Sequence, residues 1–324
     1  MNELVAHSAA MREAVRLASR VAGTDANVLV TGESGVGKDA LAHFIHMRSQ
    51  RAAASFVKID CAALPAELLE AELFGYERGA FTGASAMKPG RLEAAHKGTL
   101  VLDEIAYLST DAQAKLLRVI EEREFERLGG RSTVRVDARL IALTNVDLDE
   151  AVRRRAFRPD LFYRLNVVRI QVPPLRERRE DLRPLAQQFL KIYAAKHGRR
   201  AASIEAGALL LLENYEFPGN VRELAHVLER SVIVADAEQV EAAHLPEVVR
   251  AAASLQRKRP QRMTLAELEA AYIAETLAFA RGNKSEAARL LGISRKNLYE
   301  KLARYETEVK GQRSEVSMPS DSDL

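Results

Sequence analysis

Residues 28–39 read Val28-Leu29-Val30-Thr31-Gly32-Glu33-Ser34-Gly35-Val36-Gly37-Lys38-Asp39, and a helix-like segment, residues 39–46, overlaps their end. A strand, Gly-x4-Gly-Lys and a helix in this order are typical of a phosphate-binding loop. Glycines let backbone amides approach phosphate oxygens, the helix N-terminus adds its positive dipole end, and Lys38 reaches the outer phosphates. A glycine-rich turn between strand and helix is the alternative, so a second signal is needed.

The second signal is an apolar strand that ends in two acids, Gly98-Thr99-Leu100-Val101-Leu102-Asp103-Glu104. A fully apolar strand is expected in a parallel sheet covered on both faces, where ligands bind at the carboxyl ends of strands. Asp103 would then hold magnesium, and Glu104 would act as the base that activates water. An acidic pair after a strand can also cap a helix, but paired with the glycine-rich loop it favours an ATPase that uses ATP and Mg²⁺.

The composition describes a helix-rich globular protein of 324 residues, with 47% hydrophobic and 29% charged residues. No apolar run approaches the roughly 20 residues of a membrane span, and the N-terminus lacks a signal-peptide pattern, so a cytoplasmic protein is expected. The single cysteine, Cys61, excludes an internal disulfide. If Met1 is the native start, only about seven residues precede the first helix, and no N-terminal sensory domain exists.

Strands that alternate with helices predict a parallel α/β sheet with helices on both faces. The expected strands are residues 28–31, 56–59, 98–102, a buried strand from 134–136 and 139–144 that ends at the polar Asn145, and residues 167–172. Asn145 can bond the attacking water or the γ-phosphate, or it can cap the next helix. Only helical periodicity follows between residues 181 and 249, which predicts a small all-helical domain.

The C-terminal part has the pattern of a helix-turn-helix. Asn283 and Ser294 are N-cap residues of two short helices, and Gly292 lies in the turn between them. Between residues 281 and 304 there are seven Lys or Arg and two acids. These features favour a second helix in the DNA major groove over a basic hairpin that is merely solvated.

A segment with glycines at 75, 79 and 83 carries Phe81 at its centre. By itself this pattern slightly favours a turn that tucks Phe81 into the core over an exposed loop that contacts a partner.

Over residues 4–306 the chain resembles the bacterial enhancer-binding proteins, AAA+ activators of RNA polymerase that carries sigma-54. The most specific element is the intact GAFTGA signature, whose residues are Gly79, Ala80, Phe81, Thr82, Gly83 and Ala84. In that family this loop touches sigma-54, so the resemblance overturns the preference for a buried Phe81.

The resemblance also implies roles for other residues. The Walker A loop would comprise Gly32, Glu33, Ser34, Gly35, Val36, Gly37, Lys38 and Asp39, the last an acid where other phosphate loops have Ser or Thr. Asp103 and Glu104 resemble Walker B, Thr144-Asn145 resembles sensor I, and Arg222 resembles the sensor II arginine. Metal ligands would be Asp103 and Asp39. Arg158 and Arg164, otherwise ordinary surface charges, would reach a neighbouring subunit's nucleotide.

Residues 264–305 resemble a Fis-type DNA-binding domain that dimerises. Its expected DNA-binding residues are Lys284, Ser294, Arg295, Lys296, Asn297, Tyr299, Lys301 and Arg304. The expected domains are an AAA+ α/β subdomain (1–173), a helical lid (174–250), a basic linker (251–262), a helix-turn-helix domain (263–308) and a disordered tail (309–324).

Two positions depart from the family pattern. Asp60 stands where members typically have Asn, so we predict that Asp60 and Glu104, in one nucleotide state, share a proton. Ala6 stands where Gly is usual near the adenine pocket.

The resulting hypothesis is an activator whose dimers bind enhancer DNA, assemble to a hexamer and use ATP to remodel the sigma-54 RNA polymerase holoenzyme. Control in trans by a regulatory protein is expected. A DNA-binding repressor or scaffold with an uncoupled AAA+ domain is the alternative, which Asp60 supports, and a remodeller of another client is a second.

Overall fold

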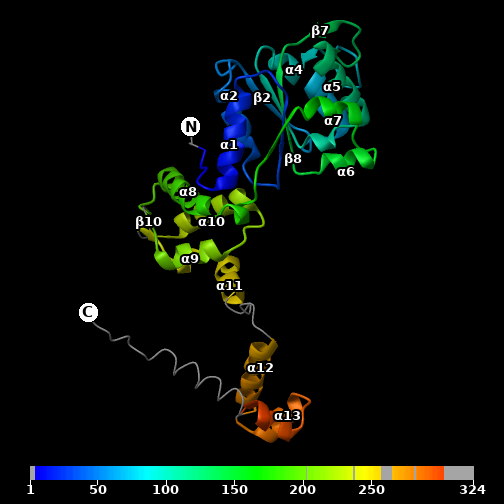
Figure 1. The fold of residues 1–324 in the computed structure, drawn as a ribbon. Coiled ribbons are helices and arrows are strands. Elements are labelled where there is room, and N and C mark those ends of the chain that lie inside the picture. The colour runs from blue at the N-terminus through cyan, green and yellow to red at the C-terminus, as the bar shows by residue number, and fades with distance from the viewer. Residues whose placement is uncertain (1–3, 202, 236–237, 257–264, 281, 303–324) are drawn as a thin grey trace, which may run out of the picture. The chain divides into compact units, whose positions relative to one another are not determined.

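The computed structural model describes residues 4–201, 203–235, 238–256, 265–280 and 282–302 (Figure 1). It divides into two compact units, residues 1–253 and residues 254–324. No helix among the described residues is long and apolar enough to cross a membrane.

A parallel sheet of five strands, in the order β2-β5-β8-β1-β9, forms the centre of the first unit. The strands are β1 (Val28–Thr31), β2 (Phe56–Asp60), β5 (Thr99–Asp103), β8 (Arg139–Thr144) and β9 (Val168–Gln171). Because all five run in one direction, their carboxyl ends meet at one edge of the sheet, where Asp60 lies beside Asp103 and Thr31 beside Thr144.

Successive residues of the central strands enter two different hydrophobic clusters. In β1, Leu29 joins one cluster, and Val28 and Val30 join the other; β5 and β8 alternate in the same way. Because side chains in a strand point to opposite faces in turn, a sheet buried on both faces requires continuous apolar runs. The parallel α/β sheet predicted from the sequence is therefore confirmed.

Helices cover both faces of this sheet. Figure 1 shows α1 (Ala9–Ala22) and α2 (Lys38–Met47) on one side of it and α5 (Thr110–Glu122) and α7 (Pro159–Leu165) on the other. The remaining helices of this subdomain are α3 (Ala66–Phe74), α4 (Arg91–Ala94), η1 (Ile105–Tyr107) and α6 (Leu148–Arg153).

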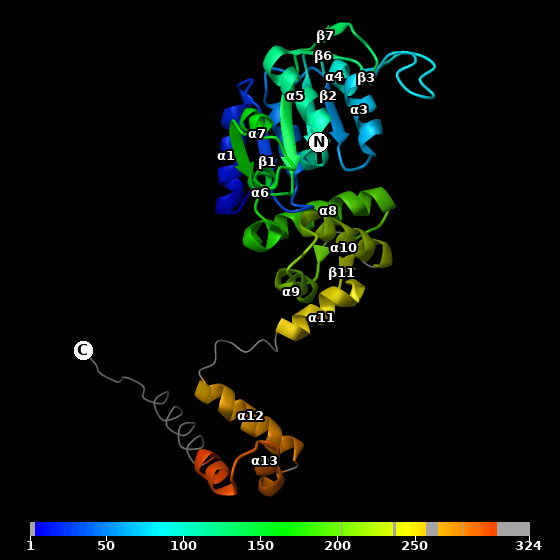
Figure 2. The same ribbon diagram turned by 90° about the vertical axis from the view of Figure 1, so that its right-hand side faces the viewer.

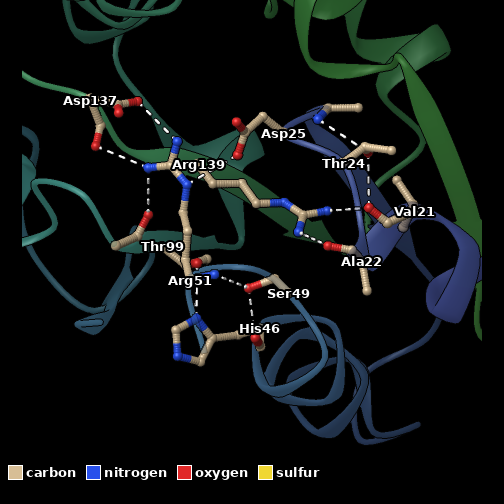
Figure 3. Close-up of polar contacts among 12 residues, drawn as sticks. Val21, Ala22, Thr24, Asp25, His46, Ser49, Arg51, Thr99, Asp137 and Arg139 are labelled. Atoms are coloured by element: carbon tan, nitrogen blue, oxygen red, sulfur yellow. Dashed lines mark hydrogen bonds and ion pairs between the residues drawn. The ribbon is translucent and has the colours of Figure 1, made fainter. Parts of the chain in front are cut away.

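A buried arginine joins α1 to the amino edge of the sheet (Figure 3). Arg139 at the start of β8 is 2% exposed, and it donates to the carbonyls of Ala22 at 2.9 Å and Val21 at 2.8 Å. Burial lowers the pKa of Arg139. The last carbonyls of a helix have no partner within the helix and carry partial negative charge, so Arg139 caps α1 at the edge opposite the phosphate loop.

Two antiparallel hairpins extend from the sheet. One joins β3 (Gly75–Tyr76) to β4 (Lys88–Pro89), and the other joins β6 (Glu124–Glu126) to β7 (Thr133–Arg135). In Figure 2 the cyan loop beside β3 projects away from the sheet. The expectation that residues 134–136 belong to the buried strand is wrong, because β7 pairs with β6 and β8 begins only at Arg139.

The rest of the first unit is a small, mainly helical bundle. Its elements are η2 (Leu175–Glu177), η3 (Arg179–Asp181), α8 (Leu182–His197), α9 (Ala206–Asn214), α10 (Asn220–Val234), η4 (Ala242–His244) and α11 (Glu247–Gln256). Two short parallel strands, β10 (Ser203–Ile204) and β11 (Gln239–Val240), correct the expectation of helices alone. α11 continues to Gln256, so helical backbone occupies the first part of the expected linker.

The described residues of the second unit include α12 (Leu265–Phe279), α13 (Lys284–Leu290) and a further helix over residues 295–302. Ile273, Ala287, Ala288 and Leu298 form its small core. Gly292, at φ 66°, turns the chain between the last two helices. Arg304, expected to bind DNA, and the expected tail lie outside the described residues.

Candidate functional site

The phosphate-binding loop is held between the sheet and the lid. A Cβ added to Gly32 would lie 2.6 Å from the carbonyl oxygen of Val172, and one added to Gly35 would lie 2.4 Å from that of Gly219. Both glycines also have positive φ, 149° and 76°. Any larger residue would collide with backbone, so these two glycines make the close approach of loop and lid possible.

Lys38 begins α2 and is 7% exposed. Its Nζ donates to the carbonyl oxygens of Gly32 at 2.8 Å and Glu33 at 3.2 Å, and it lies 3.9 Å from Glu104 Oε1. Burial lowers the pKa of Lys38. The loop therefore encloses a cation within reach of Glu104, the acid that follows β5.

Glu104 has a left-handed backbone, with φ 52°, and its Oε2 accepts a hydrogen bond from the amide of Asn145 at 3.2 Å. A non-glycine residue in this conformation carries strain and is held there by its surroundings. Asn145, the polar residue expected at the end of the strand, thus contacts Glu104 through its backbone amide. Asn145 is exposed to solvent.

Asp39 and Asp103 converge on one cation, the ammonium group of Lys58. Lys58 Nζ lies 2.5 Å from Asp39 Oδ1 and 2.8 Å from Asp103 Oδ2. Burial opposes ionisation of this lysine, but hydrogen bonds to the two carboxylates outweigh burial and raise the pKa of Lys58. Two carboxylates aimed at one point fit Mg²⁺, which takes one or two protein carboxylates and completes its shell with phosphates and water.

Lys58 was missed in the sequence analysis. Its signal was its polarity within the alternating segment 56–59, which served only to assign a strand.

Asp60 is exposed and does not meet Glu104. Its Oδ1 accepts the amide of Ala62 at 2.9 Å, and in the part of the chain that the structure describes no hydrogen bond joins the two carboxyl groups. Sharing a proton would require a rearrangement of this edge, so that hypothesis stays a prediction.

The lid contacts the phosphate loop through Arg222, which donates to Ser34 Oγ at 2.9 Å. Asn220 is fully buried at φ 53°, accepts the amide of Leu175 and donates to Glu33 Oε2 at 3.0 Å. Hydrogen bonds from Arg176 and Asn220 lower the pKa of Glu33 to about 2. The carboxylate of Glu33 ties the loop to the lid, and the cofactor-binding role expected for this residue stays a prediction.

Two cavities adjoin the loop. The smaller, about 260 Å³, is lined by Lys38, Asp103, Glu104 and Arg222 among others. The larger, about 860 Å³, has mostly apolar walls from Val5, α2 and α8 and shares Gly37 with the first. A polar compartment beside an apolar one suits the phosphates and the base of a nucleotide.

Arg158 and Arg164 line neither of these cavities. Arg158 lies just before α7 and pairs with Asp160 at 2.7 Å, and Arg164 near the end of α7 pairs with Glu121 at 2.9 Å. Neither arginine contacts the phosphate loop of its own chain.

The segment 79–84 forms an exposed turn. The amide of Gly79 donates to the carbonyl of Ala84 at 2.8 Å, and Phe81 is 43% exposed with its ring centroid 4.9 Å from that of Tyr76. Added Cβ atoms at Gly79 and Gly83 would meet nothing within 4 Å. Phe81 thus lies outside the core.

The base of this turn is held by Arg127 from the β6–β7 hairpin. Arg127 lies 2.7 Å from both Glu77 and Glu93, and these hydrogen bonds raise the pKa of Arg127. Sequence patterns offered no signal for it, because all three residues read as ordinary surface charges.

In the second unit, the amide of Asn297 donates to Ser294 Oγ at 3.2 Å, so Ser294 caps the last helix. Lys284 Nζ lies 4.7 Å from the centre of the Tyr299 ring. Arg295, Lys296 and Asn297 are exposed. Lys301, also expected to bind DNA, is 23% exposed and pairs with Glu269 of α12 at 2.7 Å.

Comparisons with known families cover nearly the whole chain. The model of the sigma-54 interaction domain matches residues 4–171, that of the AAA+ ATPase lid domain matches residues 176–262, and that of the bacterial regulatory protein, Fis family, matches residues 264–305.

Similar proteins include Regulatory protein AtoC of Escherichia coli, 43% identical over 93% of this chain and 67% of its own length. The alginate biosynthesis transcriptional regulatory protein AlgB of Pseudomonas putida is 46% identical, over 93% of this chain and 67% of its own length. The crystal structure of NtrX from Brucella abortus in complex with ATP aligns with a TM-score of 0.70 and 36% identity, covering 94% of this chain and 69% of that one.

Proposed function

Since the chain belongs to the sigma-54-dependent transcriptional activators, with an AAA+ ATPase domain and a Fis-type DNA-binding domain, we propose that it couples ATP hydrolysis to remodelling of the sigma-54 RNA polymerase holoenzyme. The domain bounds and the residue roles expected from the sequence are part of this proposal.

The arrangement around the phosphate loop carries the proposal. One cavity brings together a buried lysine, two acids after a buried strand and an arginine from the lid, namely Lys38, Asp103, Glu104 and Arg222. The adjoining apolar cavity has room for a base. NtrX, whose crystal structure in complex with ATP resembles this chain, supports ATP as the nucleotide.

Each residue of this cavity would then have a chemical role. Lys38 would bind the outer phosphates, and Glu104 would take the proton of the attacking water. Asp103 and Asp39 would hold Mg²⁺, which supplies charge neutralisation at the phosphates. Arg222 would bind a phosphate from the lid side, so that lid and loop close on the nucleotide together.

Arg158 and Arg164 would act on a neighbouring subunit's nucleotide in a hexamer. Their absence from the two cavities beside the phosphate loop of their own chain supports this, because an arginine supplied in trans stabilises transition-state charge only after assembly. The ion pairs with Asp160 and Glu121 would have to open for this contact.

The exposed turn with Phe81 and Thr82 would contact sigma-54, and its anchoring through Arg127 supports a transmitted movement. The exposed residues of the last helix, with Lys284 and Tyr299, would contact enhancer DNA.

Transcription reconstituted on a sigma-54 promoter with an upstream site tests the proposal. We expect open complexes with ATP and none without it or with a non-hydrolysable analogue. Glu104→Gln serves as the matched control, since it should bind ATP without hydrolysing it. Hydrolysis without open complexes would contradict the coupling, and the absence of both would favour the repressor or scaffold.

A further inference from the structure

The carboxylates proposed to hold magnesium already have a partner within the chain. Lys58 Nζ bonds Asp39 Oδ1 at 2.5 Å and Asp103 Oδ2 at 2.8 Å. Asp103 is 15% exposed, so it cannot turn freely to another partner in solvent. The same oxygen atoms would have to ligate a metal.

The fold directs Lys58 to this point. Val57 and Ile59 pack into the cluster on the α5 side of the sheet, and Phe56 packs on the α2 side. Since side chains alternate along a strand, Lys58 shares the α2 face with Phe56 and reaches the start of α2, where Asp39 lies.

The local charge explains what a lysine can do there. Acidic groups in this corner are Asp39, Asp103, Glu104 and Asp60, while Lys38 is already bonded to the carbonyls of the phosphate loop. Without Lys58, Asp39 and Asp103 would attract a free divalent ion and repel a nucleotide that arrives without one.

We propose that Lys58 is an internal counter-cation that competes with the divalent ion for Asp39 and Asp103. It makes the site select a metal–nucleotide complex over the free metal, because phosphate oxygens must supply the additional ligands that displace the ammonium group. This inference rests on the proposed function and adds a residue that determines what the same site binds.

Two binding measurements on the full chain test it, both made without turnover. Binding of Mn²⁺ alone is followed by electron paramagnetic resonance, and binding of ADP is followed by calorimetry in EDTA and in Mg²⁺. The variants are Lys58→Met, which keeps the apolar stem, and Lys58→Gln, which keeps polarity. Lys58→Arg retains the charge, and Lys196→Met removes a more exposed ion pair with Glu229 in the lid.

We expect Lys58→Met and Lys58→Gln to bind Mn²⁺ about tenfold more tightly than the wild type and, in EDTA, ADP about tenfold more weakly. Mg²⁺ should restore ADP affinity. Lys58→Arg and Lys196→Met should match the wild type.

Unchanged affinity of both Lys58 variants for Mn²⁺ and for ADP in EDTA would overturn the inference. A wild type that binds no ADP in Mg²⁺ would instead overturn the proposed function, and the Mn²⁺ measurement would still decide the role of Lys58. If Lys58→Met has a lower thermal stability than the wild type, the conclusion is drawn from Lys58→Gln. This second variant also removes the charge, so misfolding is separated from loss of charge.

Discussion

Two glycine-rich loops of this chain look alike in sequence and differ in structure. In the phosphate loop, a Cβ at Gly35 would collide with the backbone of Gly219 at 2.4 Å, whereas one at Gly83 in the segment 79–84 would meet nothing within 4 Å. Lys38 is 7% exposed, whereas Phe81 is 43% exposed. Glycine permits close packing at Gly32 and Gly35 of the first loop, whereas at Gly37 and in the segment 79–84 it serves backbone conformation alone.

The difference separates two tasks. The phosphate loop holds a ligand and is clamped by the sheet and the lid, so its geometry is set before binding. The segment 79–84 is held at its base by Arg127, and its Phe81 side chain contacts Tyr76 but stays largely exposed. We therefore expect changes in the first loop to affect nucleotide binding and stability, and side-chain changes at Phe81 or Thr82 in the second to affect transcriptional output alone.

Removing the buried cation should have the largest effect. We expect Lys38→Ala to lower ATP affinity by more than about 100-fold, because the phosphates lose a charged partner in a partly desolvated site. Calorimetry with ATP measures the loss, and circular dichroism checks the fold. Affinity within a few-fold of the wild type would contradict the position assigned to the phosphates.

In the exposed segment, we expect Thr82→Ala to leave ATP hydrolysis and stability unchanged but to abolish the formation of open complexes. The threonine is exposed, so removing its hydroxyl disturbs no packing. Parallel assays of phosphate release and of open-complex formation separate the two outcomes. Retained activation would remove the role assigned to this turn.

A matched pair of glycine substitutions addresses the comparison itself. We expect Gly35→Ala to lower the free energy of unfolding by about 2–4 kcal/mol, through collision with backbone as well as positive φ. Gly83→Ala, at φ 108°, should cost only about 1–2 kcal/mol from its backbone conformation. Denaturant titrations give both values, and equal losses would show that the two loops are packed alike.

The smallest expected effect is that of acid on the hydrogen bonds by which Glu33 joins the phosphate loop to the lid. The pKa of Glu33 is lowered from 4.5 to about 2 by Arg176 and Asn220, so its stabilisation is present above pH 4.5 and disappears as the pH falls toward 2. Because the carboxylate is 43% exposed, solvent screening limits this to about 1 kcal/mol.

Unfolding free energies at pH 7 and pH 3 measure this contribution. Glu33→Gln should lose less stability than the wild type between these values. Glu247→Gln, in the first turn of α11, is the control and should follow the wild type. Parallel pH dependence of all three proteins would assign no such role to Glu33.

Much of the fold could be predicted from the sequence because its signals are local. Continuous apolar runs predicted the parallel sheet, and the order of strand, glycines, lysine and helix predicted the phosphate loop. Two expectations failed for the same reason. Val134 pairs with Phe125 in a hairpin and β10 pairs with β11, and neither pairing is visible in the pattern of apolar residues within the segment itself.

The site divides in the same way. Side-chain type and spacing along the chain were enough to identify Lys38, the acids at the end of β5 and the GAFTGA segment as candidate functional residues. Each of these features lies within one continuous stretch of sequence. Only the tertiary structure decided that Lys58 reaches Asp39 and Asp103 and that Lys301 turns to Glu269. These contacts join elements that the sequence separates, and packing of strands against helices sets their distances.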